Sequence, residues 1–120
     1  ARIVAALGER HSEVPVIGFP KGAGGKLAAY ARETGVAALG LDETVDPAWA
    51  AKELPADLPV QGNLDPLALA AGGEALRSAV ERILDAFADR PHIFNLGHGI
   101  LQDTPVERVG ELIALVKGDK

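Results

Sequence analysis

The chain is predicted to be an α/β protein built on a parallel sheet, and three observations support this fold class. Short apolar runs of strand type alternate with helical patterns four times along the 120 residues. The runs are continuously apolar, which is typical of strands buried on both faces of a parallel sheet. The units take about 30 residues each. Strand–helix units of this length join through right-handed crossovers into one sheet.

The first unit follows a helical pattern at the start of the chain, in which Ile3, Val4 and Leu7 share one face. A strand is expected over 14–19, where the run is short and apolar. A glycine-rich loop leads from this strand into a helix that ends at Gly35, a residue suited to a left-handed C-cap. Because the chain begins inside a helical pattern and contains no methionine, we expect a piece of a longer protein.

The remaining units repeat the order of strand and helix. Strands are expected over 36–41, 59–63 and 92–96. Asp46 and Pro47 are typical of a helix start, with an oxygen cap followed by proline in the first turn. The third unit has an apolar stripe at helical spacing, and residues 104–107 of the fourth resemble a capping box. The apolar positions expected to face inward are Leu76, Val80, Ile83, Leu84, Phe87, Val106, Val109, Leu112, Ile113 and Val116.

This spacing is that of a (β/α)8 barrel, which has about 250 residues, so four units would form half of one. A small flavodoxin-like, doubly wound sheet is the alternative architecture. One domain fits the length, and 48% hydrophobic residues are enough for a packed core. No apolar run is long enough for a membrane span, and residues at the start of the given sequence do not show a basic stretch followed by an apolar one. A net charge of −5 with scattered basic residues argues against nucleic-acid binding.

Several kinds of site find little support. The glycines between Gly22 and Gly25 follow a strand, but the phosphate-loop pattern fails at Pro20 and Leu27. The three histidines lack ligand spacing and the chain has no cysteine, so no metal site is assigned. No serine has a histidine and a carboxylate arranged beside it in the pattern of a hydrolase. The glycine-rich loop remains a flexible connection, with Lys21 at its mouth able to reach an anionic ligand.

Polar residues stand where the predicted strands end, and in a barrel these positions converge on the catalytic face. They are Lys21, Asp42, Asn63 with Asp65, and His98. For Asp42 and Asp65, capping of the following short helices and contact with a ligand are equally good interpretations. His98 stands out because glycines flank it directly after a strand, which leaves room for a ligand beside the imidazole ring.

The chain resembles the uroporphyrinogen decarboxylase family from about residue 14 to residue 116. The two longer blocks together make the resemblance specific, and 14–22 is similar to the strand and loop that precede them. The blocks are Gly40-Leu41-Asp42, Gln61-Gly62-Asn63-Leu64-Asp65-Pro66 and Asn95-Leu96-Gly97-His98-Gly99-Ile100 with Asp103-Thr104-Pro105.

The resemblance implies a cytoplasmic, homodimeric (β/α)8 barrel enzyme that removes carbon dioxide from the four acetate side chains of uroporphyrinogen, giving coproporphyrinogen without a cofactor. It implies that residues 1–120 are the C-terminal portion of one barrel domain. His98 matches the family's substrate-cleft histidine, and Lys21 and Asn63 are candidates for the rim of the cleft. No catalytic residue and no metal ligand is assigned on this chain. The family's cleft arginines and aspartate belong to the other half of the barrel, so the fragment alone is expected to be inactive.

Two alternatives remain. Corrinoid-dependent methyltransferases have the same barrel, but they need thiolate zinc ligands, one of them near the last strand, where this chain has Gly97, His98 and Gly99 and no cysteine. The other alternative is a binding module made from a self-associating half-barrel. In it, the strands at 14–19 and 92–96 would have open edges, and dimerisation would cover the apolar side chains that point toward the barrel axis.

Overall fold

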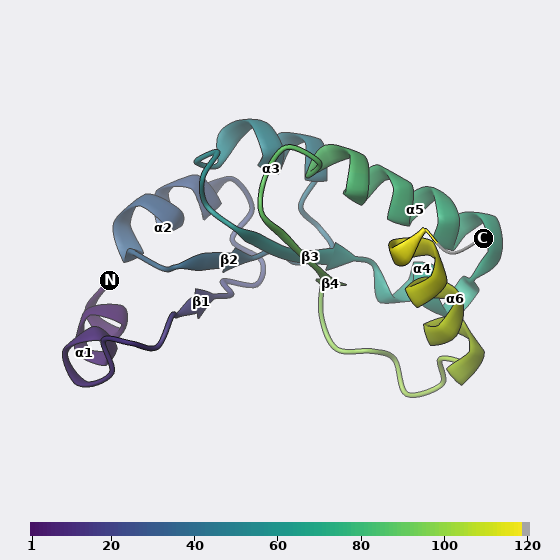
Figure 1. The fold of residues 1–120 in the computed structure, drawn as a ribbon, viewed down its shortest axis with the longest axis horizontal. Helices are drawn as coiled ribbons and strands as arrows, with labels where there is room; N and C mark the ends of the chain where they lie inside the picture. The colour runs from purple at the N-terminus through teal and green to yellow at the C-terminus, as the bar shows by residue number, and fades with distance from the viewer. Residues whose placement is uncertain (119–120) are drawn as a thin grey trace.

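The computed structural model describes residues 1–118, which form one four-stranded parallel sheet with helices along it (Figure 1). The elements follow each other in the predicted alternating order. They are α1 (Arg2–Arg10), β1 (Ile17–Gly18), the 3-10 turn η1 (Gly24–Lys26), α2 (Leu27–Thr34), β2 (Ala38–Gly40), α3 (Pro47–Glu53), β3 (Val60–Leu64), α4 (Pro66–Ala71), α5 (Gly73–Ala86), β4 (His92–Leu96) and α6 (Val106–Lys117).

The strands lie side by side in the order of the sequence, β1-β2-β3-β4, and every neighbouring pair is parallel. The register places Ile17 opposite Ala38, Leu39 opposite Val60, and Val60 opposite His92. A doubly wound sheet reverses its strand order at a switch point, whereas a barrel keeps the order of the chain. The α/β class is therefore confirmed, and the topology is that of consecutive barrel units.

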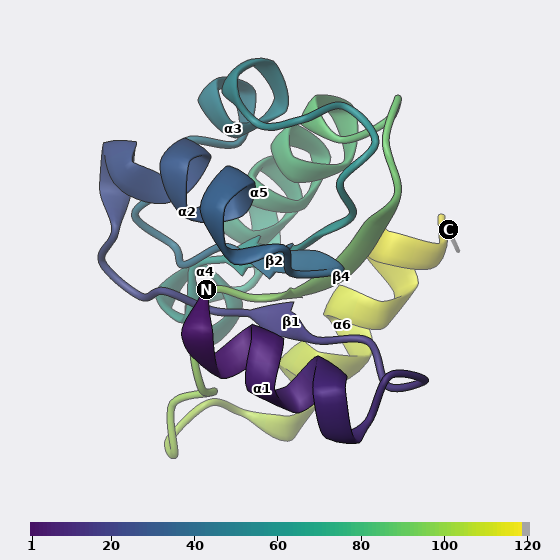
Figure 2. The same cartoon turned by 90° about the vertical axis from the view of Figure 1, so that its left-hand side faces the viewer.

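Helices α2, α3 and α5 cover one face of the sheet, and the core lies between them (Figures 1 and 2). Leu39 and Val60 point into this core and are fully buried. The apolar stripe predicted for the third unit lies on α5, and its side chains at Leu76, Val80 and Ile83 are at most 2% exposed. Each such side chain stabilises the fold by about 1.5–3 kcal/mol relative to an exposed position.

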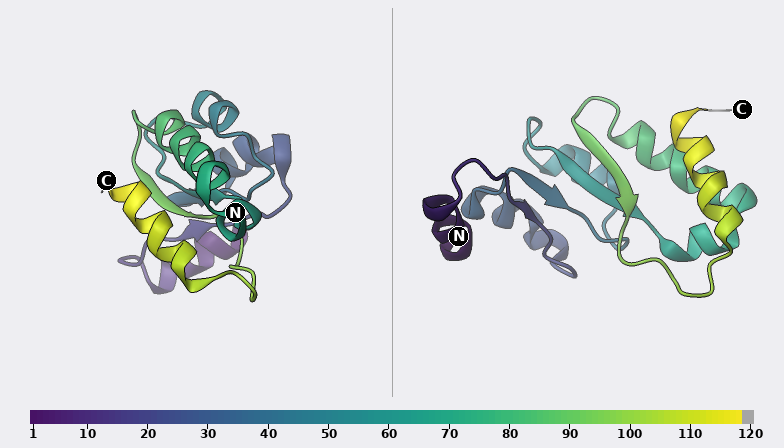
Figure 3. Two further views of the ribbon diagram at one scale, coloured as in Figure 1. Left: turned by 90° about the vertical axis from the view of Figure 1, so that its right-hand side faces the viewer. Right: turned by 60° about the horizontal axis from the view of Figure 1, so that its bottom comes forward.

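The opposite face of the sheet carries no helix over its middle, as the right-hand view of Figure 3 shows. Apolar side chains on this side remain about half exposed: Ile17 45%, Phe19 49% and Ile93 47%. The prediction that residues 14–19 are buried on both faces is therefore wrong, because no helix covers the side chains of this segment on the second face of the sheet. The predicted open edges are confirmed, since β1 and β4 are the outer strands of the sheet.

Two predicted helix ends have the expected geometry. Gly35 follows α2 in the left-handed conformation, with φ 70°. Asp46 precedes α3, and its carboxylate accepts a hydrogen bond of 3.1 Å from the Trp49 amide, with Pro47 in the first turn. At the chain start α1 forms as expected, although Ile3 on its apolar face is 77% exposed.

The capping box predicted at the start of α6 is wrong. The helix begins at Val106, with Pro105 at the N-cap, and no side chain bonds to its first turn. Thr104 therefore lies outside the helix, where its hydroxyl cannot reach the first free amides. Val106 is 80% exposed and Ile113 48% exposed, so these two do not face inward as predicted. Within 1–118, no helix has the length and apolarity needed to cross a membrane.

Candidate functional site

A pocket of about 460 Å³ opens at the carboxyl end of the strands, on the face that carries no helix. The end of β4 and the segment after it form one wall, and residues at the ends of β1 and β2 together with Gln61 of β3 form the rest. Its only ionisable lining residue within the described chain is His98. The lining consists of Phe19, Gly40, Leu41, Gln61, Asn95, Leu96, Gly97, His98, Gly99 and Ile100.

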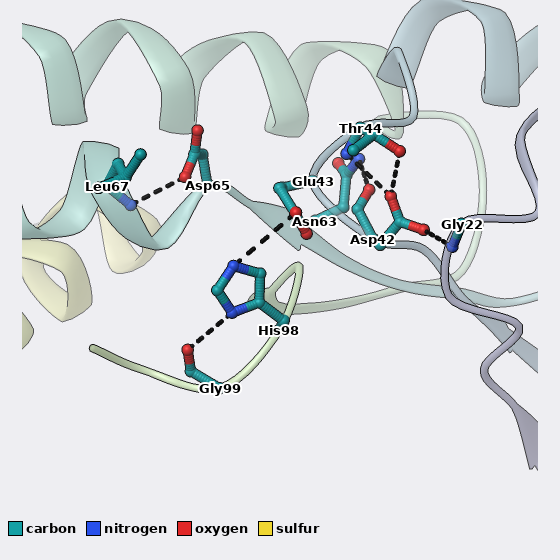
Figure 4. Close-up of polar contacts among 9 residues, drawn as sticks. All are labelled: Gly22, Asp42, Glu43, Thr44, Asn63, Asp65, Leu67, His98 and Gly99. Carbon is teal, nitrogen blue, oxygen red and sulfur yellow. Dashed lines mark hydrogen bonds and ion pairs between the residues drawn. The ribbon is translucent and has the colours of Figure 1, made fainter. Parts of the chain in front are cut away.

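The imidazole ring of His98 is held between two acceptors (Figure 4). Its Nδ1 lies 2.9 Å from the carbonyl oxygen of Gly99. Its Nε2 lies 3.8 Å from Oε1 of Glu43, which belongs to the loop between β2 and α3. The His98 side chain is 30% exposed. The structure thus places this ring at the carboxyl end of the sheet, the position expected from the sequence.

Asp42 organises the loop that follows β2. Its carboxylate accepts a 2.6 Å bond from the Gly22 amide, a 2.9 Å bond from the Thr44 amide, and a bond from the Thr44 hydroxyl. Burial by itself would raise the pKa of this carboxyl group. The bonds from Thr44 and Gly22 and the charge of Lys21 outweigh burial, so the pKa of Asp42 is lowered below its ordinary value. Asp42 therefore stays ionised and ties two loops together.

Asn63 anchors the same loop from β3. Its side-chain amide donates to the carbonyl oxygens of Asp42 at 2.9 Å and Val45 at 2.7 Å, and the residue is 4% exposed. In this structure Asn63 lies beneath the loop and does not line the pocket. A place for Asn63 at the rim of the complete cleft stays a prediction.

Lys21 and Asp65, the other polar residues at strand ends, lie apart from the pocket. Lys21 is exposed in the loop after β1 and does not line the pocket, although its charge acts on Asp42. Asp65 caps α4 by accepting a 2.8 Å bond from the Leu67 amide, so the capping interpretation holds there. For Asp42 it does not hold, since Asp46 caps α3 instead.

Glu43 is the site residue that sequence reasoning missed. Its neighbour Asp42 drew attention as the polar residue after β2, and nothing in the sequence places Glu43 beside a histidine two strands away. The contact depends on Gly97. A Cβ there would overlap the backbone nitrogen of Glu43, so only glycine lets the two loops approach so closely. A glycine before the histidine is thus a signal of close backbone approach.

His92 lies elsewhere, at the start of β4. Its ring packs against Phe87 and Phe94, with centroid distances of 4.8 and 5.8 Å. Its Nε2–H donates to the Gly62 carbonyl oxygen at 2.6 Å. Burial lowers the pKa of His92, and the bond to Gly62 offsets only part of that effect. This histidine is part of the packing and does not line the pocket.

Across 1–118, no group of three or more His, Asp or Glu side chains is placed to hold a metal ion. A groove of about 1030 Å³ lies between α1 and β1. Its lining is mainly apolar, with Arg2 as its charged residue, so it offers no set of reacting groups.

Comparison with known proteins identifies the family. The family model described as uroporphyrinogen decarboxylase (URO-D) matches residues 1–118. The chain belongs to the uroporphyrinogen decarboxylase family. A protein named uroporphyrinogen decarboxylase from Novosphingobium aromaticivorans is 65% identical over 98% of this chain and 35% of its own length. Relatives of the same name from Rhizorhabdus wittichii and Sphingopyxis alaskensis are each 69% identical over 98% of this chain.

The chain spans about a third of the length of these relatives. Members of the uroporphyrinogen decarboxylase family are TIM barrels, and the four parallel strands in chain order fit half of such a barrel. The bare face of the sheet, with Ile17, Phe19 and Ile93 exposed, is then the side that points to the barrel axis.

Proposed function

We propose that this chain is the C-terminal portion of a uroporphyrinogen decarboxylase and that it supplies one wall of the substrate cleft. The observation that carries the proposal is the 65–69% identity to relatives of that name along almost the whole chain. The pocket at the carboxyl end of the strands supports it, because barrel enzymes place their active sites there.

The reaction sets requirements that the pocket meets in part. Each acetate side chain loses its carboxylate as carbon dioxide, and the remaining methylene carbon takes up a proton to become a methyl group. Such a site needs cations that hold carboxylates and a group that delivers a proton. His98 can serve either need, as a hydrogen-bond donor to a substrate carboxylate or as a group that orients the proton donor.

Most of the positive charge must come from outside this chain. Among the described residues that line the pocket, His98 alone can carry a charge, and the chain as a whole has a net charge of −5. A substrate with eight carboxylates needs a concentration of cationic side chains. The four units therefore form an incomplete site, and we expect the isolated chain to be inactive.

The test compares the full-length protein that carries these residues with the 120-residue chain alone. Each is incubated anaerobically with uroporphyrinogen III, and the oxidised porphyrins are separated by chromatography. We expect four equivalents of carbon dioxide and coproporphyrin from the full-length protein, and none from the chain alone. Absence of turnover by the full-length protein would refute the proposed activity, and full activity of the short chain would refute the incomplete site.

The proposal extends to assembly and location. We expect the full-length protein to be a cytoplasmic homo-oligomer and the short chain to self-associate through its bare sheet face and open edges. Light scattering gives the mass of each. A stable monomer of the short chain would contradict the expected exposure of an apolar face. Fractionation of cells should recover the full-length protein with the cytoplasm, and recovery with membranes would refute that location.

A further inference from the structure

We propose that Glu43 is a positioning residue for His98, and this inference rests on the proposed function. Glu43 contacts the imidazole of His98 but is not among the residues that line the pocket, whereas His98 is. The carboxylate does not line the pocket, so its effect on a substrate passes through the ring. Glu43 thereby fixes the orientation and the hydrogen-bonding state of the one ionisable group in the pocket wall of the described chain.

The surroundings of the Glu43 carboxylate call for a cationic partner. Its side chain is 20% exposed, and Oε1 lies 3.8 Å from Nε2 of His98. Its other oxygen, Oε2, is buried and has no hydrogen-bond partner among the described residues. A largely buried carboxylate is costly unless a charge or a donor compensates it. Within 1–118, the imidazole is the one basic group found within 4 Å of this carboxylate.

The second ring nitrogen adds an independent constraint. Nδ1 of His98 faces the carbonyl oxygen of Gly99 at 2.9 Å, and a carbonyl oxygen can only accept a hydrogen bond. The carboxylate on the Nε2 side is also only an acceptor. The Gly99 contact places a hydrogen on Nδ1, and Nε2 then faces the Glu43 carboxylate at 3.8 Å, which is longer than a hydrogen bond. The two contacts together limit how the ring can turn beside the pocket.

The backbone on both sides holds the pair in register. On the Glu43 side, Asn63 and the carboxylate of Asp42 fix the loop through hydrogen bonds to its main chain. On the His98 side, Gly97 packs directly against the backbone of Glu43. The two loops thus meet over the end of β3, which keeps the backbones of Glu43 and His98 close together.

The experiment uses the full-length protein with Glu43→Gln, which keeps the shape of the side chain and removes its charge. The matched control is Glu53→Gln, the same change at an exposed residue that ends α3. We expect Glu43→Gln to lower kcat/KM for uroporphyrinogen by about tenfold, mostly through KM, because the variant removes the carboxylate charge that faces the ring at 3.8 Å. The control should match the wild type.

Two further variants separate charge from shape. Glu43→Asp keeps the charge but not the length, so it should retain more activity than Glu43→Gln; the reverse order would overturn the proposal. In a His98→Gln background, Glu43→Gln should cause no further loss, because its effect passes through the ring. An equal loss in both backgrounds would show that Glu43 acts on the fold or the substrate by another route.

A spectroscopic arm does not depend on turnover. With ¹⁵N-labelled histidine, the chemical shifts of the His98 ring nitrogens should change in Glu43→Gln and stay unchanged in Glu53→Gln. Unchanged shifts in Glu43→Gln would overturn the positioning role, even in an active enzyme. If the wild type failed to convert uroporphyrinogen but the shifts changed as expected, the proposed activity would fail while the pairing of Glu43 with His98 stood.

Discussion

Replacement of Asn63 by alanine in the full-length protein tests how the site is held together. The Asn63 amide donates at 2.9 and 2.7 Å to the carbonyl oxygens of Asp42 and Val45. The Asp42 carbonyl keeps one bond, from the Val45 amide, whereas the Val45 carbonyl loses its side-chain donor. The substitution removes two hydrogen bonds, each of which contributes about 0.5–1.5 kcal/mol, and it leaves one buried acceptor unpaired. We therefore expect the free energy of unfolding to fall by about 2 kcal/mol.

The assay is urea unfolding followed by circular dichroism, with the free energy taken from the midpoint and slope. Asn95→Ala is the matched control, because Asn95 lies opposite Asn63 in the register but is exposed and bonds only to the adjacent Leu96 amide. We expect the control to lose less than about 1 kcal/mol. The reasoning is refuted if Asn63→Ala unfolds at the wild-type urea concentration but raises KM, since Asn63 would then contact the substrate and not the loop.

Two other predictions follow from the packing. In the folded protein the pKa of His92 lies below the ordinary value of 6.5, so as the pH falls the unfolded chain binds a proton at this residue before the folded chain does. The contribution of neutral His92 to the stability of the fold is therefore complete above about pH 6.5 and declines as the pH falls toward the folded pKa. In urea titrations from pH 7 to 5, His92→Gln should therefore lose less stability than the wild type; equal slopes would contradict this. Gly97→Ala should destabilise the fold by about 1–3 kcal/mol by pushing the Glu43 loop away, whereas Gly99→Ala, with open space around it, should not. Thermal unfolding distinguishes the two, and equal melting temperatures would mean that the loops do not pack as described.

The order of the elements could be predicted from the sequence because local patterns specify it. The apolar stripe ending near Phe87 is long enough to specify α5, and the Asp46-Pro47 pair marks a helix start by its own chemistry. Strand lengths were less predictable. β1 has only two residues and lies at an edge of the sheet with one neighbour.

The site could be predicted only in part. His98 carries a local signal, a histidine between glycines after a strand, whereas its partner Glu43 comes from a loop two strands away. The sequence placed Asn63 at the carboxyl edge of the sheet. The alternation of side chains along a strand does not show, however, that the Asn63 amide turns under a neighbouring loop. Such contacts depend on how the loops meet over β3, and single-strand patterns contain no information about that.

The claim that His98 forms part of the substrate-binding wall is tested most directly by the kcat/KM of His98→Ala for uroporphyrinogen. The full-length protein is used, with His11→Ala as the control at an exposed loop position. Loss of a charge-assisted contact predicts a fall of about tenfold or more, at an unchanged melting temperature. A kcat/KM equal to that of the wild type would contradict the account and leave His98 as a residue of the loop alone.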